Sequence, residues 1–390
     1  MIVDGSRRVA AIGLLAILSL FFFTITQNVS AQEELKGRPM FGVRPLANAN
    51  LDAIQAQSNA STGLKVWTYK VTSTRTGSKG KSYTGVMVGN SPLTTKATTT
   101  TTVYVVPLIF DIGGQTFNPT VADSACLAGK VPETVLKNSP MVLATHDFKV
   151  NGVDMGATQY SDAFQRSNFW KDVSALGGTY HNKLAYKFLP AKTIKPGTSH
   201  STLLSLSGSC TLLYGAVEIN WFDSYIAGTV IPSLASAGVG PTNLVAFMMY
   251  NVTMYVSTTA SCCVLGYHGA FGSPAQTYAP FEFDSAGAFG TASEDTDVMA
   301  HEIDEWQDDP LGNNPTPAWG HVGQQTGCQT NLEVGDPLSG TNFPNVTMNG
   351  FTYHLQELAF FSWFYGGPSI GAGGKFSDHG TFTSAQGPCT

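Results

Sequence analysis

The segment HEIDE at positions 301–305 brings together residue types that bind metal ions and transfer protons. His301 and Glu305 lie four positions apart, so on a helix their side chains project from successive turns of one face and can hold one cation. Glu302 then points beside that cation, where it can take a proton from a water molecule. The spacing therefore predicts a metal-dependent hydrolytic site with Glu302 as general base.

A longer pattern extends from this segment: HExxE is followed by DP at 309–310 and by EVGD at 333–336. It resembles a group of secreted bacterial proteins that carry H-E-x-x-E, a D-P helix stop and a downstream E-h-G-D, and that look like zincin-type metallopeptidases. The resemblance implies zinc-dependent hydrolysis of peptide bonds. Glu305 stands where the zincin motif H-E-x-x-H has its second histidine. Because a carboxylate is a harder ligand than imidazole, calcium and manganese are alternatives to zinc.

The resemblance also implies that a further ligand comes from downstream. By analogy with zincins that use a later glutamate, we expect Glu333 to be this ligand. Asp336 either binds the ion or orients His301 through a hydrogen bond. Two further candidates are Asp309, on the polar side of the predicted helix, and His321, whose imidazole would restore a set of two histidines and one carboxylate.

The catalytic segment must lie on a helix for this spacing to work. TASE at 291–294 matches a capping box, and Asp295 and Asp297 add negative charge where the helix dipole favours it. Pro310 ends the helix, so we predict a helix over 293–309. Three apolar residues share one face of it, which we expect to be buried: Met299, Ile303 and Trp306.

The pattern of the remaining chain changes near residue 212. Before it, β-branched and aromatic runs predict strands at 64–71, 83–88 and 98–112, and one helix at 160–173. After it, we predict a strand at 216–222, a helix at 224–236, and strands at 244–256 and 276–283. An extended substrate peptide would add to an edge strand, for which 276–283 is the candidate.

We therefore predict an α+β fold with two domains. A β-rich N-terminal domain covers residues 62–211, and a zincin-like α/β metallopeptidase-type domain covers 212–390. A linker or disordered tail over 32–61 precedes them.

The first 31 residues have the features of a signal peptide: Arg7 and Arg8, an apolar run over 9–26, and a small-x-small cleavage site ending at Ala31. We expect a secreted, periplasmic or extracellular protein that is not membrane-bound after cleavage. Six cysteines allow up to three disulfides in fifteen possible pairings. The net charge of −6 and the lack of a basic cluster exclude a nucleic-acid partner.

Other histidines are interpreted structurally. We expect His268, in the segment GYHG, to cap or pack in a glycine-rich turn, and His354 and Glu357 to belong to an element that flanks the core. The Cys262-Cys263 and GYHG segments are also similar to secreted plant phosphate-induced proteins, which implies no chemistry. A second hypothesis for the whole chain is a non-catalytic secreted binding or cell-surface protein with a structural calcium or no metal. A closed, all-oxygen shell would favour it.

Overall fold

The structure is a computed structural model that describes residues 33–34, 38–207 and 209–390. The predicted signal peptide lies outside these described residues. Within them the fold is mixed α/β and rich in strands, with 21% helix and 38% strand. This confirms the predicted mixture of helices and strands. No helix in the described part of the chain is long and apolar enough to cross a bilayer.

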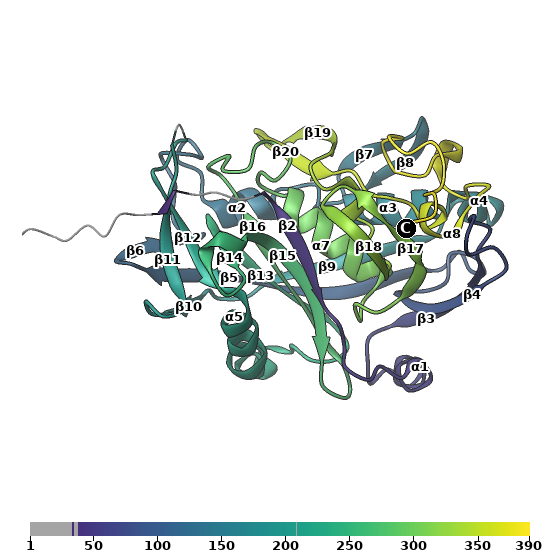
Figure 1. The fold of residues 1–390 in the computed structure, drawn as a ribbon, viewed down its shortest axis with the longest axis horizontal. Helices are drawn as coiled ribbons and strands as arrows, with labels where there is room; N and C mark the ends of the chain where they lie inside the picture. Colours follow the sequence, from purple (N-terminus) through teal and green to yellow (C-terminus); the bar gives the residue numbers. More distant parts are fainter. Residues whose placement is uncertain (1–32, 35–37, 208) are drawn as a thin grey trace, which may run out of the picture. The chain divides into compact units, whose positions relative to one another are not determined.

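The main element is a 12-stranded sheet that curls into a half-barrel (Figure 1). Its strand order is β1-β11-β12-β14-β15-β16-β13-β5-β10, with β2 paired to β15 and with β6 and β9 paired to β5. The strands are β1 (Glu33–Glu34), β2 (Met40–Arg44), β5 (Thr98–Ile112), β6 (Gln115–Phe117), β9 (His181–Phe188), β10 (Lys192–Ile194), β11 (Ser201–Ser205), β12 (Leu213–Glu218), β13 (Leu244–Tyr250), β14 (Val252–Tyr255), β15 (Cys262–Phe271) and β16 (Gln276–Phe283).

Two-stranded antiparallel sheets and short helices surround this sheet. The hairpins are β3 (Val66–Thr72) with β4 (Ser82–Val88), β7 (His146–Val150) with β8 (Val153–Thr158), β17 (Pro315–Val322) with β18 (Gln325–Asn331), and β19 (Asn342–Met348) with β20 (Phe351–Gln356). The α-helices are α1 (Leu51–Asn59), α2 (Pro132–Lys137), α3 (Tyr160–Asn168), α4 (Trp170–Ala175), α5 (Ile219–Tyr225), α6 (Ile231–Ser233), α7 (Asp297–Asp308) and α8 (Phe361–Tyr365).

The central strand β13 is buried on both of its faces. Its sequence LVAFMMY is apolar throughout, as expected of a strand with parallel partners on both sides, here β5 and β16. Alternate side chains enter two different apolar clusters. Leu244, Ala246 and Met248 belong to the larger cluster, which also contains the apolar residues of α7. Val245 and Phe247 belong to the smaller cluster on the other face.

The predicted strands before residue 212 are confirmed as β3, β4 and β5, and the helix at 160–173 is present as α3 and α4. The strand predicted at 216–222 is wrong beyond Glu218, because the Glu218 carboxylate accepts a hydrogen bond from Trp221 N at 2.8 Å and caps α5 there. The strand predicted at 244–256 is interrupted at Asn251, whose φ of 51° is outside the extended region.

The sheet contains strands from both sides of residue 212. β5 pairs with β13, and the chain from Glu33 to Thr390 forms one compact unit. Strands from both predicted domains therefore belong to one sheet. The predicted linker at 32–61 contains β2, which pairs with β15, and α1, which Asn50 caps by accepting a hydrogen bond from Ala53 N at 3.0 Å.

The strand at 276–283 is β16, and it lies between β15 and β13. All of its residues are buried. The expectation that it is an open edge for a substrate peptide is therefore wrong, because both of its backbone edges are already paired.

The helix α7 packs against β15, β16 and β20 (Figure 1). All twelve of its residues are buried, including its polar ones. It begins at Asp297 rather than at 293, because the Asp295 carboxylate does not cap a longer helix but accepts hydrogen bonds from Thr296 N and His354 N. Its end at Asp308 agrees with the predicted stop at Pro310.

The six cysteines form three disulfides: Cys126–Cys210, Cys262–Cys263 and Cys328–Cys389. This confirms the expectation of disulfides, while the pairing itself is new information. Cys328–Cys389 ties the β17–β18 hairpin to the C-terminal segment.

Candidate metal centre

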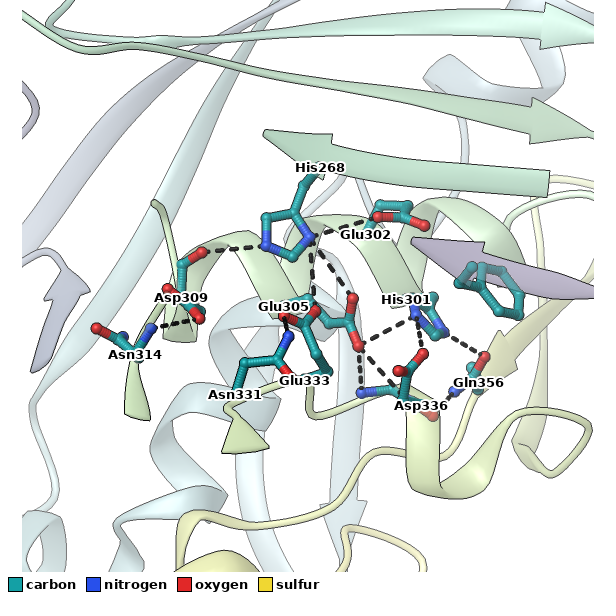
Figure 2. Close-up of polar contacts among 12 residues, drawn as sticks. His268, His301, Glu302, Glu305, Asp309, Asn314, Asn331, Glu333, Asp336 and Gln356 are labelled. Carbon is teal, nitrogen blue, oxygen red and sulfur yellow. Dashed lines mark hydrogen bonds and ion pairs between the residues drawn. The ribbon is translucent and has the colours of Figure 1, made fainter. Parts of the chain in front are cut away.

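His301 and Glu305 lie one turn apart on α7 and face each other (Figure 2). His301 Nε2 is 3.1 Å from Glu305 Oε1, and both side chains are buried. This is the arrangement expected for residues four positions apart on a helix.

The orientation of the His301 ring is set by Gln356 and Phe41. The Gln356 amide donates from Nε2 to Gly335 O at 2.5 Å, which leaves its Oε1 to accept from His301 Nδ1 at 2.9 Å. In the neutral ring, His301 Nδ1 therefore carries the proton and Nε2 presents a lone pair. The Phe41 ring of β2 stacks on the imidazole at 3.7 Å between centroids. His301 Nε2 has no hydrogen-bond partner in the described structure.

Asp336 completes a group of three donors around His301. Its Oδ1 is 3.6 Å from His301 Nε2. Its carboxylate is oriented by Gln324, which donates to Oδ1, and by Gln329, which donates to Oδ2 at 3.0 Å. One ligand atom each from His301, Glu305 and Asp336 lies within 4.8 Å of the others.

The turn that carries Asp336 is attached directly to Glu305. Glu305 Oε1 accepts hydrogen bonds from Gly335 N at 3.0 Å and from Asp336 N at 3.2 Å. Gly335 is needed for this approach, because a Cβ at its position would lie 2.4 Å from His301 Nδ1. The EVGD segment is thereby fixed against the helix.

Glu333 lies in a second group, on the other side of Glu305 (Figure 2). The third member is His268 of β15, whose Nδ1 is 3.6 Å from Glu305 Oε2, 3.9 Å from Glu333 Oε2 and 3.6 Å from Glu302 Oε2. One ligand atom each from His268, Glu305 and Glu333 again lies within 4.8 Å of the others. The structure thus places the two downstream candidates, Glu333 and Asp336, with different histidines.

His268 was not expected at the site. The interpretation as a turn histidine is wrong, because His268 lies inside a buried strand. Gly266 and His268 are two positions apart and share the face of β15 that meets α7. A Cβ at Gly266 would lie 2.6 Å from Glu302 Oε1, so this glycine allows the helix to approach. The alternation of glycine and histidine in the GYHG segment was the signal that could have shown this.

Glu302 lies beneath β15 with both carboxylate oxygens buried and without hydrogen-bond donors in the described structure. Its Oε2 faces His268 Nδ1. Glu302 therefore lies where α7 meets β15, beside the His301 group and close to the His268 group.

The electrostatics of the centre are those of crowded, buried acids. Burial alone would lower the pKa of His301, but Glu305 and Glu302 raise it to about 10. Burial raises the pKa of Glu302 to about 7, against the opposing effect of His268 and His301. It raises the pKa of Asp336 to about 7 as well. Burial acts in the same direction on Glu305, but the two histidines hold its pKa well below its ordinary value. The centre therefore stabilises a positive charge that lies between its carboxylates.

Two sequence candidates do not join the centre as ligands. The Asp309 carboxylate accepts from Asn313 N at 3.0 Å and from Asn314 N at 2.8 Å, so it ends the helix, and only its carbonyl oxygen contacts His268, at 3.1 Å from Nε2. His321 is exposed on the β17–β18 hairpin, with Nε2 4.0 Å from Cys328 Sγ. None of its described contacts involves His301 or Glu305.

His354 and Glu357 have different hydrogen-bond partners in different parts of the fold. His354 Nδ1 is 2.7 Å from Asp295 Oδ2, whereas the Glu357 carboxylate accepts hydrogen bonds from Ser377 Oγ at 2.6 Å and Thr381 Oγ1 at 2.6 Å. Glu357 therefore organises the C-terminal segment, as expected of an element that flanks the core.

Comparison with known proteins gives no family. No family model matches the chain, no curated protein matches it, and no solved structure matches it.

Proposed function

We propose that the protein is a secreted, zinc-dependent peptidase of zincin-like type, in which His301, Glu305 and Asp336 hold the cation and Glu302 is the general base. The observation that carries this proposal is the convergence of His301 Nε2, Glu305 Oε1 and Asp336 Oδ1 beside Glu302. Calcium and manganese are the alternative cations, because two of the three ligands are carboxylates.

The donor set fits a divalent cation. His301 offers a lone pair on a buried nitrogen without a hydrogen-bond partner, and its other nitrogen is held by Gln356. Asp336 is held by three glutamine side chains and Glu305 by two backbone N–H groups. Ligands that are oriented by such outer contacts bind a metal with little rearrangement.

When bound, zinc would polarise a carbonyl group and lower the pKa of water. The role of the chain would then lie with Glu302. Its carboxylate has no donors that would compete for a proton, and burial raises its pKa to about 7, the range in which a carboxylate both accepts and returns a proton near neutral pH.

Access to the centre requires movement of β2. Phe41 covers the His301 ring, and Gln324 bridges Phe41 and Asp336 by donating from Nε2 to Phe41 O at 3.1 Å and to Asp336 Oδ1. The strand β2 also pairs with β15 alongside His268. A substrate peptide would have to displace β2 and could take its place on β15.

A second candidate function is a secreted binding protein with a structural cation. The complete burial of His301, Glu302 and Glu305 favours it, since a catalytic cation needs a position open to substrate. The two functions share the ligands and differ in whether Glu302 acts on a substrate.

The test compares the wild-type chain with Glu302→Gln and with Glu294→Gln as a matched control. Glu294 is a half-buried acid whose nearest ion pair is with His354 at 3.7 Å. Metal content is measured by elemental analysis, and cleavage of casein and of a peptide library is measured with and without chelator.

We expect bound zinc in all three proteins, and cleavage that is lost in Glu302→Gln and after chelation but kept in Glu294→Gln. Bound metal with no cleavage by the wild-type chain would support the structural cation instead. The absence of metal from the wild-type chain would refute both functions.

A further inference from the structure

Glu305 presents its two carboxylate oxygens to two different groups of side chains (Figure 2). Oε1 lies 3.1 Å from His301 Nε2, and Oε2 lies 3.6 Å from His268 Nδ1. Each group adds one more carboxylate, Asp336 beside His301 and Glu333 beside His268. We propose that the protein binds a second divalent transition-metal cation through His268, Glu305 and Glu333, so that Glu305 bridges two cations in one dinuclear centre.

The protonation of His268 fits a metal ligand. Its Nε2 is 3.1 Å from Asp309 O, and because a carbonyl oxygen can only accept, Nε2 carries the proton of the neutral ring. Nδ1 then presents its lone pair to the carboxylates. This atom is fully buried and has no hydrogen-bond partner in the described structure. A lone pair directed at carboxylate oxygens is repulsive unless a cation or a proton lies between them.

The distances distinguish a cation from a set of hydrogen bonds. His268 Nδ1 lies 3.6, 3.6 and 3.9 Å from oxygens of Glu302, Glu305 and Glu333. All three separations exceed the usual length of a nitrogen–oxygen hydrogen bond. Ligand atoms about 2.1 Å from a tetrahedral zinc are separated from one another by about 3.4 Å. The group is therefore close to the spacing of a ligand shell.

The charge of the centre also calls for two cations. Four buried carboxylates meet there, those of Glu302, Glu305, Glu333 and Asp336, and their ion pairs in the described structure are with histidines only. With both imidazoles neutral and all four carboxylates ionised, one divalent cation would balance half of this charge and two would balance all of it. A buried charge without compensation is strongly destabilising, so the second cation supplies what the first cannot.

Two similar groups elsewhere lack these properties. In the group of Glu294, Asp295 and His354, the imidazole is already satisfied by a 2.7 Å contact with Asp295. In the group of His321, Cys328 and Cys389, the two sulfurs form a disulfide and are not thiolates. Only the group of His268 combines an unpartnered imidazole nitrogen with a carboxylate shared with the first cation site, among the described groups.

The second cation site rests on the proposed function, which supplies the cation at His301. The experiment distinguishes failure of the second site from failure of the proposed function. The full chain is stripped with chelator under mild denaturation, refolded, and titrated with zinc, and the metal bound per chain is measured by elemental analysis after dialysis. The variants are Glu333→Gln for the second site, Asp336→Asn for the first, and Glu294→Gln as the control. Circular dichroism checks that each variant is folded.

We expect two ions per chain in the wild type and in Glu294→Gln, and one ion in each of Glu333→Gln and Asp336→Asn. One ion in the wild type, kept in Glu333→Gln and lost in Asp336→Asn, would overturn the second site and leave the proposed function intact. One ion lost in Glu333→Gln and kept in Asp336→Asn would overturn the dinuclear centre and the proposed first-site ligands together.

A measurement on the wild-type chain alone guards against variants that fail to fold. The stripped protein is loaded with manganese(II) and followed by electron paramagnetic resonance. Two ions that share the Glu305 carboxylate should give a spin-coupled spectrum at two equivalents and an uncoupled one in Asp336→Asn. An uncoupled spectrum from two bound ions in the wild type would refute the bridging role of Glu305.

Discussion

Replacing Gly335 by alanine tests whether the EVGD segment positions His301. Gly335 has φ −84° and ψ −39°, which alanine adopts without strain, so only the added methyl group matters. A Cβ there would lie 2.4 Å from His301 Nδ1, and ordinary contacts begin at 3.4 Å, so the ring or the turn must move by about 1 Å. Functional geometry tolerates about 0.5 Å.

The His301 ring cannot move by that amount without losing contacts. It is hydrogen-bonded to Gln356 at 2.9 Å and stacked on Phe41 at 3.7 Å between centroids. Disturbing the groups that orient a metal ligand lowers metal affinity by about 10–100-fold. The overpacking itself should cost about 1–3 kcal/mol of unfolding free energy.

The assay is competitive zinc binding against a chromophoric chelator, together with thermal unfolding of the metal-free protein. Gly240→Ala is the matched control, because a Cβ at Gly240 has no neighbour within 4 Å. We expect weaker zinc binding and a lower unfolding temperature in Gly335→Ala, and no change in Gly240→Ala. Zinc affinity of Gly335→Ala within about twofold of the wild type would refute the role given to this contact.

Three further predictions follow from other contacts. Gly266→Ala would place a Cβ 2.6 Å from Glu302 Oε1, so we expect it to keep the ion at His301 but to lose at least about tenfold in peptide cleavage, measured beside metal content. Burial, and to a smaller extent Asp284, raises the pKa of Glu282 well above its ordinary value. The folded chain therefore holds a proton that the unfolded chain releases, and the free energy of unfolding falls as pH rises above about 4.5. Glu282→Gln should flatten this fall in thermal unfolding from pH 4.5 to 8, and an unchanged slope would contradict the prediction. Cys126→Ser opens a disulfide between residues 84 positions apart and should lower the free energy of unfolding by about 2–5 kcal/mol in a denaturant titration. Cys262→Ser opens a disulfide between adjacent residues, which closes almost no loop, so it should lower this free energy much less. Equal losses in the two variants would contradict the prediction.

Local spacing predicted the helical part of the centre because the relevant interactions are four residues apart. His301 and Glu305 face each other as expected, and the apolar residues of α7 enter the core. The start of the helix was misplaced because Asp295 satisfies backbone groups of two segments, one of them the distant strand β20.

The partners from other elements could not be read from spacing. His268 reaches the helix only because β15 is an interior strand beside α7, and Gly266 permits the approach. The turn at Gly335, whose N–H donates to Glu305, determines that Asp336 rather than Glu333 lies beside His301. Sequence alone offered both acids without the geometry that separates them.

The change of pattern near residue 212 could not show how the strands on its two sides pair. The sheet is assembled from pairings between strands far apart in the chain, such as β5 with β13 and β2 with β15. A change of composition near residue 212 carries no information on such pairings. The apolar run of β13 did indicate a buried strand, but not its neighbours.

The strand β2 has a consequence for the kinetics of metal exchange. It lies over a centre whose donor residues are almost fully buried, and it is fastened by Gln324 to Phe41 N at 2.6 Å, by Arg38 to Gln324 O at 2.8 Å, and by Leu46 N to Leu311 O at 2.8 Å. Cations held by the proposed centre would enter or leave only when this cover opens, so their exchange rate would report the opening of β2 rather than their affinity. Above a threshold concentration of chelator, the rate of metal loss should no longer depend on how much chelator is present. The metal content of a purified sample would then reflect the ions that were present when the chain folded.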